Sequence, residues 1–280
     1  MNCLLVINRL SGNSSKVHEE ELIRKYAAED AVSVKYIEDT TDTYSVEGID
    51  KLIICGGDGT LNKAINLCRN KQIDIYYLPF GTFNETAKGK RGTGVFSLAK
   101  LGRLQDSDFS YVAAAGSFTD IGNSPSAKSK HRFKILAYFS KVLSSYKVHT
   151  IDAEITTDTF SVKDTYTLIM LSNAKRCFGF RFNRLYKDNS DELQILLIKA
   201  PKKKNLWGKI KMFFPFFRAF FIGFSKEYQS KNILFTSIKK GTIFLSEPVD
   251  FCIDGEAKEL SGALRIDKLP HPSRVFIIKE

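Results

Sequence analysis

The sequence predicts an α/β domain built on a parallel sheet, followed by a mostly antiparallel β-sandwich domain. Two observations predict this order. Up to about Tyr111, short apolar strands alternate with helical segments, and three of the strands end in a polar loop that contains glycine. From Val112 onward, strand-like segments follow one another closely, as they do in a sandwich or barrel. We therefore expect a first domain over residues 1–115 and a second over residues 116–271.

The first domain is predicted from segments of alternating type. Strands are expected at residues 3–7, 32–37, 51–55 and 73–78, and helices at residues 19–28, from residue 61 onward and at residues 86–88. A strand that leads through a short loop into a helix is half of a βαβ unit, so the sheet is expected to be parallel. The carboxyl ends of parallel strands share one edge, and open α/β sheets bind ligands at that edge.

The second domain is predicted from segments of alternating hydrophobicity. Strands are expected at residues 153–157, 166–171, 193–198, 242–245 and 251–253, with one helix at about residues 134–145. Their close spacing favours antiparallel neighbours.

Composition and cysteine usage agree with a folded protein of the cytoplasm. Hydrophobic residues make up 43% of the chain, which is ordinary for a globular protein. The chain contains no run of about 18 uninterrupted apolar residues, so we expect no transmembrane helix. The first residues lack the pattern of a signal peptide. The five cysteines are scattered and odd in number, which favours reduced thiols over a disulfide framework or a zinc site.

The segment GGDGT at residues 56–60 follows an apolar strand and precedes a helical pattern. Glycine leaves room for a bulky anion to approach backbone N–H groups, and the start of a helix adds further free N–H groups. Asp58 among these amides would repel a phosphate unless a cation bridges the two charges, which points to a nucleoside triphosphate with Mg²⁺. The first domain is therefore predicted to bind nucleotide. The alternative interpretation is an ordinary tight turn rich in glycine and aspartate.

Two other strands end in loops of similar character. Residues 79–84 read PFGTFN, and residues 8–13 read NRLSGN. Because three such loops lie at the carboxyl ends of parallel strands, we expect them to gather in one crevice.

These segments resemble the diacylglycerol kinase catalytic-domain family, bacterial lipid kinases that are distantly related to NAD kinases and phosphofructokinases. Residues 56–60 match the nucleotide loop of the family, and residues 8–12 stand where it has an Asn-Pro-x-Ser-Gly loop. Residues 79–84 are similar to its Pro-x-Gly-Thr-x-Asn segment, and residues 254–256 to its Asp-Gly-Glu motif. The resemblance implies an active site between the two domains and a last strand, within residues 272–280, that returns to the first.

The resemblance also implies which residues bind ATP. These are Asn8, Ser11, Gly12, Thr40, Gly56, Gly57, Asp58, Gly59, Thr60, Leu61, Asn62, Gly81, Thr82 and Asn84. Asp58 is the residue expected to connect the nucleotide to Mg²⁺.

Asp254 and Glu256 place two carboxylates on one short turn. Transfer of phosphate to an alcohol needs a group that accepts the hydroxyl proton, and crowding of like charges raises the pKa of one carboxylate toward that role. The alternative is a simple hairpin, because Asp-Gly is a favoured two-residue turn. By resemblance, Glu256 is the expected proton acceptor, and Asp254 is expected to assist it or to contact metal. Asp58 completes the expected catalytic set.

The acidic loop at residues 188–193 resembles a family element that holds a structural Mg²⁺. The resemblance implies that Asp188, Asp191 and the main chain of Leu193 are its ligands. Oxygen ligands on a short loop suit such a cation. Glu192 replaces the usual glycine, which puts the metal geometry in doubt. The alternative is a solvated acidic loop.

The net charge of +11 is concentrated at residues 202–226, where seven cations are interleaved with seven phenylalanines and the only tryptophan. Such a segment fits a membrane surface, with aromatic rings in the interface and cations on anionic head groups. The alternative is that the phenylalanines pack into the core of the second domain, and Pro215 argues against one long helix. No motif supports nucleic-acid binding.

The sequence therefore predicts a cytoplasmic, ATP- and Mg²⁺-dependent kinase that associates peripherally with membranes and phosphorylates a lipid alcohol such as diacylglycerol. The alternatives are an enzyme like NAD kinase and a nucleotide-binding regulator without catalysis. The sequence leaves a homodimer open.

Overall fold

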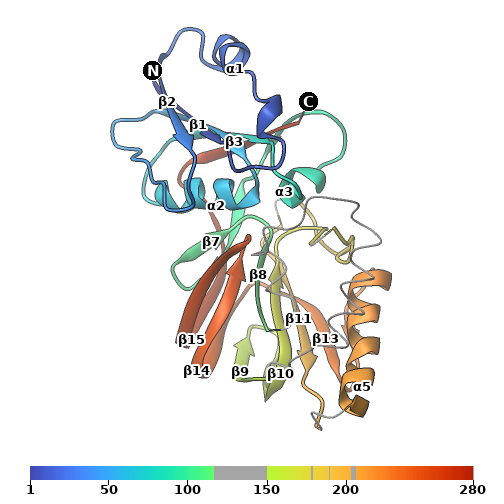
Figure 1. Cartoon of the computed structure of the whole chain (residues 1–280). Helices are drawn as coiled ribbons and strands as arrows, with labels where there is room; N and C mark the ends of the chain where they lie inside the picture. Colours follow the sequence, from blue (N-terminus) through green and yellow to red (C-terminus); the bar gives the residue numbers. More distant parts are fainter. Residues whose placement is uncertain (117–149, 178, 189, 203–205, 280) are drawn as a thin grey trace.

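The computed structural model describes residues 1–116, 150–177, 179–188, 190–202 and 206–279, which form two sheets arranged one above the other (Figure 1). Sheet A has six strands in the order β2-β1-β3-β4-β16-β5. They are β1 (Asn2–Asn8), β2 (Ala31–Ile37), β3 (Lys51–Gly56), β4 (Asp74–Pro79), β5 (Gly94–Ser97) and β16 (Arg274–Lys279). The connections carry the helices η1 (Ser14–Lys16), α1 (Glu19–Tyr26), α2 (Asp58–Leu67) and α3 (Glu85–Lys88).

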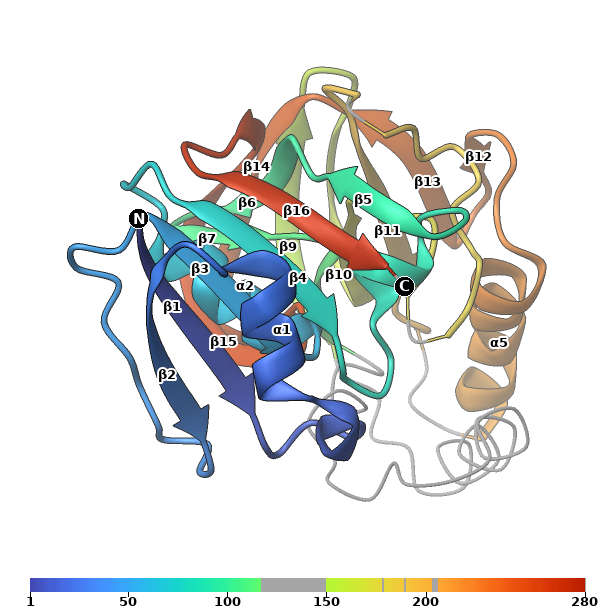
Figure 2. The same cartoon turned by 90° about the horizontal axis from the view of Figure 1, so that it is seen from above.

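The strands of sheet A run parallel, except that β5 is antiparallel to β16. Alternate residues of each apolar strand face opposite layers. Leu5 and Ile53 pack with Leu22 of α1, whereas Val6 and Ile54 pack in the layer that contains α2. Figure 2 shows these two helices on opposite sides of the sheet. Burial of both faces explains why these strands read as continuous apolar runs.

Helix α2 begins at Asp58, so the predicted start at Leu61 is wrong by one turn. Gly57 is extended and caps the helix, and the N–H group of Leu61 donates to its carbonyl oxygen at 3.1 Å. The residues Asp58, Gly59 and Thr60 therefore form the first helical turn, whose N–H groups have no partner within the helix. The glycine-rich segment is the beginning of a helix rather than a loop in front of one.

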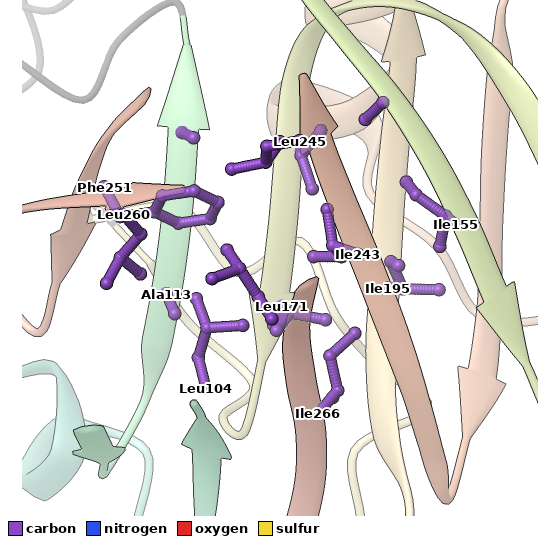
Figure 3. Packing of buried hydrophobic residues seen from close by; sticks show 14 of the residues in the cluster. Leu104, Ala113, Ile155, Leu171, Ile195, Ile243, Leu245, Phe251, Leu260 and Ile266 are labelled. Atoms are coloured by element: carbon purple, nitrogen blue, oxygen red, sulfur yellow. The ribbon is translucent and has the colours of Figure 1, made fainter. Parts of the chain in front are cut away.

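The second sheet, sheet B, has ten strands, and all of its strand pairs are antiparallel. They are β6 (Lys100–Leu104), β7 (Ser107–Phe109), β8 (Val112–Gly116), β9 (Ile151–Thr157), β10 (Ser161–Ser172), β11 (Leu193–Lys199), β12 (Tyr228–Gln229), β13 (Ile233–Ile238), β14 (Lys240–Ile253) and β15 (Glu256–Pro270). Sheet B encloses an apolar core to which Leu171, Ile195 and Phe251 contribute (Figure 3). The predicted fold class is confirmed.

Several elements differ from the sequence expectation. The two strands expected at residues 242–245 and 251–253 are one strand, β14, with a register shift between Leu245 and Val249. Strands β6 to β8 belong to sheet B, so the chain leaves sheet A after β5, before residue 116. Strand β16 returns to sheet A and lies between β4 and β5 (Figure 2). The helix expected at residues 134–145 lies outside the described residues.

Helix α5 (Leu206–Phe216) lies beside sheet B (Figure 1) and ends one residue after Pro215, the proline that was expected to prevent one long helix. The chain continues directly into one stretch of π-helix, η3 (Phe217–Ile222). Proline has no N–H group to continue the α-helical hydrogen-bond ladder, and the change of helix type follows directly after it. Among the described residues, no helix is both long and apolar enough to cross a membrane.

Candidate active site

A cleft of about 330 Å³ lies where the carboxyl ends of β1, β3 and β4 meet the turn between β14 and β15. Sheet A and its connections contribute Asn8, Ser11, Gly12, Thr40, Gly57, Asp58, Gly59, Thr60, Lys63, Gly81 and Thr82 to its walls. The other wall consists of Tyr111, Asp254, Gly255 and Glu256. Most of the nucleotide-binding residues expected from the sequence therefore face one cavity, together with both acids of the distant turn.

The three strand-end loops are packed into one unit. The amide Nδ2 of Asn8 donates to Oγ1 of Thr60 at 2.8 Å, and the N–H group of Gly81 donates to the carbonyl oxygen of Gly56 at 2.9 Å. A Cβ atom on Gly81 would lie 2.4 Å from the Cα atom of Gly57, and one on Gly12 would lie 2.4 Å from Oγ1 of Thr82. Glycine is required at position 81 because two backbones touch there, whereas a side chain at position 12 would have to displace the hydroxyl of Thr82.

Four of the expected residues stabilise the loops from behind the cleft. Leu61 is fully buried in the core under α2. Gly56 lies so close to Thr60 that a Cβ atom would meet its hydroxyl oxygen at 2.5 Å. Asn84 has a left-handed backbone (φ 49°), and its side chain donates to the carbonyl oxygens of Pro79 and Gly81. Asn62, the fourth, donates to Asp254 at 3.2 Å.

Asp58 is held by two helices at once. It lies in the first turn of α2, and its carboxylate accepts hydrogen bonds from the N–H groups of Glu85 at 2.7 Å and Thr86 at 3.1 Å, at the start of α3. Burial raises the pKa of this carboxyl, and the hydrogen bonds act against the rise. Each oxygen keeps capacity for a further partner from the cleft.

Asp254 is the most firmly held acid of the cleft. Its backbone is left-handed (φ 50°), and only 1% of its surface is exposed. The carboxylate accepts hydrogen bonds from the N–H groups of Ser110, Tyr111 and Val112, from the hydroxyl of Ser110 and from the amide of Asn62. Burial raises its pKa to about 6. These donors come from the start of β8 and from α2, so Asp254 joins the two domains.

Glu256 differs from Asp254 in that its side chain is exposed at the mouth of the cleft. No hydrogen bond or ion pair to its carboxylate is found among the described residues. Its Oε1 atom lies beside the first turn of α2, since a Cβ atom on Gly59 would meet it at 2.8 Å. Of the two acids on this turn, Glu256 is the one that is free to meet a ligand.

The structure brings in residues that the sequence reasoning missed. Lys63 is the only cation among the described residues that line the cleft, and its ammonium group donates to the carbonyl oxygen of Thr40 at 3.3 Å. Its spacing of four residues from Gly59 is the signal that could have found it, because residues four apart share one face of a helix. Tyr111 gave no such signal, because it reaches the cleft through the pairing of β8 with β14.

Glu85 links the same site to the second domain. It is 1% exposed, and its carboxylate contacts the guanidinium of Arg176 at 3.3 Å and accepts a hydrogen bond from the N–H group of Gly179 at 2.6 Å. Burial raises the pKa of this carboxyl, and Arg176 acts against the rise. The start of α3, which also holds Asp58, is thereby fixed to the second domain.

The acidic loop at residues 188–193 lies away from the cleft. Asp188 forms an ion pair with Lys90, Asp191 forms one with Lys100, and the side chain of Leu193 is buried in β11. Among the described residues, no group of three or more His, Cys, Asp or Glu side chains is arranged to hold a metal ion. The residues present do not fit a structural Mg²⁺ at this loop.

The aromatic segment divides between core and surface. Phe216, Phe220 and Phe224 are buried against sheet B, in agreement with the core interpretation. Phe214, Phe217, Phe221 and Ile222 are 65%, 39%, 37% and 50% exposed. Phe217 stacks on Phe221 with ring centroids 5.1 Å apart. The segment thus has a buried face and an exposed apolar face.

Comparisons with known proteins agree with the motifs. Residues 2–96 match the model of the diacylglycerol kinase catalytic domain. A protein of Streptococcus pneumoniae serotype 4 (strain ATCC BAA-334 / TIGR4) named "Putative lipid kinase" is 23% identical over 234 residues, which cover 75% of this chain and 77% of that protein.

Solved structures show the same fold. A "putative diacylglycerol kinase" from Bacillus anthracis str. Sterne superposes with a TM-score of 0.69 at 18% identity, and the match covers 100% of this chain and 97% of that chain. A second structure from the same organism, described as a diacylglycerol kinase, gives a TM-score of 0.62 at 16% identity and the same coverage. The family model over residues 2–96 and the lipid-kinase relative confirm the family resemblance predicted from the sequence, and the solved structures share the fold.

Proposed function

We propose that this chain, a relative of the diacylglycerol kinase catalytic-domain family, is an ATP- and Mg²⁺-dependent kinase that phosphorylates the hydroxyl of diacylglycerol or a related lipid alcohol. The observation that carries the proposal is the cleft itself. Strand-end loops rich in glycine meet a free carboxylate, Glu256, from a distant part of the chain. A phosphate donor and an alcohol acceptor need these two kinds of group side by side.

The phosphates of ATP fit the start of α2. The first turn of the helix offers free N–H groups and the positive end of the helix dipole, and Gly57 and Gly81 leave the backbone open to a bulky anion. Lys63 adds a positive charge in the same wall. Mg²⁺ that arrives with ATP neutralises phosphate charge, and Asp58 is the carboxylate best placed to hold it.

Glu256 is the proposed proton acceptor for the hydroxyl of the lipid. A carboxylate exposed at the cleft mouth takes the hydroxyl proton as the new bond to phosphorus forms. Asp254 positions this acid rather than sharing its role, because five hydrogen bonds already occupy its carboxylate. The fixed turn keeps Glu256 beside the start of α2, where the phosphates are expected.

The exposed face of α5 and η3 suits the lipid nature of the acceptor. Phe214 and Ile222 are at least half exposed, and Phe217 and Phe221 extend the same apolar surface. Large exposed apolar groups favour a bilayer interface, where the hydrophobic effect drives them out of water. This face would let the kinase work peripherally on a membrane that carries its substrate.

The test is transfer of the labelled γ-phosphate of ATP, with Mg²⁺, to vesicles that contain diacylglycerol, monoacylglycerol, ceramide or sphingoid base. We expect label in one of the lipids. Glu256→Gln is expected to lower kcat at least about a hundredfold, as for loss of a general base, with the affinity for ATP unchanged. Asp58→Ala is expected to abolish transfer.

The same assay separates the alternatives. Label in NAD, offered in a separate tube, and in no lipid would make the chain an NAD kinase. Binding of ATP without transfer to any acceptor would make it a regulator. Lys71→Met, which removes an exposed cation remote from the cleft, is the matched control and should keep full activity.

A further inference from the structure

Three lysine ammonium groups contact the acidic loop at residues 188–193. The ammonium of Lys90 pairs with the Asp188 carboxylate, and that of Lys100 pairs with the Asp191 carboxylate. The ammonium of Lys268 donates a hydrogen bond to the main-chain oxygen of Glu192 at 3.0 Å. The three lysines come from the turn after α3, from the first residue of β6 and from β15.

Burial is distributed unequally across these contacts. The side chain of Lys90 is 8% exposed and that of Lys100 is 24% exposed, whereas their acidic partners are 45% and 69% exposed. Lys268 as a residue is 7% exposed, and its ammonium group lies 5.4 Å from the ring centre of Tyr186. The positive charges therefore lie beneath the loop, and the carboxylates lie on its outer side.

Carboxylate and main-chain oxygens are the ligands of a hard divalent cation. In this loop, the carboxylate oxygens and the main-chain oxygen face the ammonium groups of lysine side chains. A divalent ion bound at these oxygens would lie close to three positive charges, which Coulomb repulsion disfavours.

We propose that Lys90, Lys100 and Lys268 take the place of a structural metal ion and hold the loop at residues 188–193 without one. The inference goes beyond the proposed function and does not depend on it, because it concerns the folded protein in the absence of nucleotide. It leaves the Mg²⁺ that accompanies ATP as the divalent cation that the enzyme needs.

The first test uses the nucleotide-free full chain after dialysis against a chelator. Its Tm is expected to be the same in EDTA, MgCl₂ and CaCl₂ at matched ionic strength, and titration calorimetry with Mn²⁺ is expected to show no stoichiometric site. Binding of one Mn²⁺ per chain that Asp191→Asn abolishes would overturn the proposal. Because no substrate is present, failure of the kinase assay would leave this result intact.

The second test removes the built-in cations. The double variant Lys100→Met and Lys268→Met is expected to lower Tm by about 4 °C or more, because the loop loses two of its three cationic contacts. Lys71→Met, in an exposed pair with Glu47, is the matched control and should change Tm little. If the double variant does not fold, Lys100→Met alone is measured. A Tm equal to that of the control in the folded variant would show that the lysines do not hold the loop.

Discussion

Residues of one chemical type have different roles within the same cleft. Asp58 is buried but keeps capacity for a ligand, and Asp254 is saturated by hydrogen bonds. Glu256 is exposed and has no hydrogen-bond or ion-pair partner within the part of the chain that the structure describes. Environment and not residue type decides which carboxylate can accept a proton or contact a cation.

The buried position of Asp254 makes stability depend on pH in a defined direction. Its pKa is about 6 in the folded chain, against about 3.9 for an ordinary aspartate, so the folded state binds more protons between these values. The stability that protonation of Asp254 contributes to the folded state is therefore fully present below about pH 4 and declines as the pH rises to about 6. Relative to Asp254→Asn, which does not titrate, the wild type should lose stability over this window.

Urea unfolding of both proteins at pH 4.5 and pH 7 checks this prediction. The difference in the free energy of unfolding should change by about 3 kcal/mol or less, the upper bound set by the pKa shift. The Asp254→Asn variant should also have a lower free energy of unfolding than the wild type at both pH values. The reason is that the N–H groups of the asparagine amide face the donors of Ser110 and Tyr111. Parallel stabilities at the two pH values would contradict the assigned pKa.

Sequence reasoning found the two acids, and the family resemblance named Glu256 as the proton acceptor, but neither revealed how Asp254 is held. The pair at residues 254 and 256 was visible as a short acidic turn. The donors that saturate Asp254 lie more than 140 positions away in the chain, at Ser110 to Val112, and no local pattern announces them.

At the scale of elements, α5 and η3 show one segment with two environments. The periodicity of a helix places Phe216 and Phe220 on one side and Phe217 and Phe221 on another. Phe224, which follows the end of η3, is also buried. The sequence predicted a membrane contact for this segment and left core packing as the alternative, because its phenylalanines are too dense for a clear amphipathic pattern. The fold shows that both faces are apolar, with only one of them covered by sheet B among the described residues.

The exposed face leads to a prediction about vesicle binding. Replacing Phe214 and Ile222 by serine removes two exposed apolar side chains, so binding to anionic vesicles with diacylglycerol should weaken by about tenfold or more. Vesicle sedimentation measures the change. Phe244→Ser is the matched control, because Phe244 is 53% exposed on β14, and it should bind like the wild type. Equal binding by the double variant and the control would refute a role for this face.

The start of α2 shows how far sequence reasoning reaches for elements. The βαβ alternation and the glycine-rich segment were enough to predict the parallel sheet and the cleft at its edge. The helix boundary was wrong, because two glycines in three residues suggested a loop. Tertiary contacts decide otherwise: Asn8 holds Thr60, and the start of α3 holds Asp58 within the first turn.

At the scale of the molecule, the ion pair of Glu85 with Arg176 connects the domain of sheet A to the domain of sheet B beside the cleft. Arg176→Met leaves the carboxylate of Glu85 buried without its cation, which should cost about 3 kcal/mol of folding stability. The double variant Glu85→Gln and Arg176→Met should recover much of this loss, because glutamine carries no charge and its oxygen can still accept the hydrogen bond from Gly179.

Chemical unfolding of the two variants and the wild type measures the recovery. Equal stability of the single and double variants would show that the cost arises from lost packing of Arg176 and not from an unpaired charge. The sequence offered no route to this pair, because its members are 91 positions apart and no motif includes Arg176.

Strand β16 has a consequence for how the protein is made. It is an interior strand of sheet A, between β4 and the edge strand β5, although it lies at residues 274–279. The ribosome releases the earlier strands of sheet A long before β16 emerges, so β4 waits with one edge unpaired until the chain has been synthesised through Lys279. An unpaired apolar edge is prone to aggregate. Sheet A, which supports the cleft, is therefore completed only after β16 has been synthesised, when the strands of sheet B have already left the ribosome.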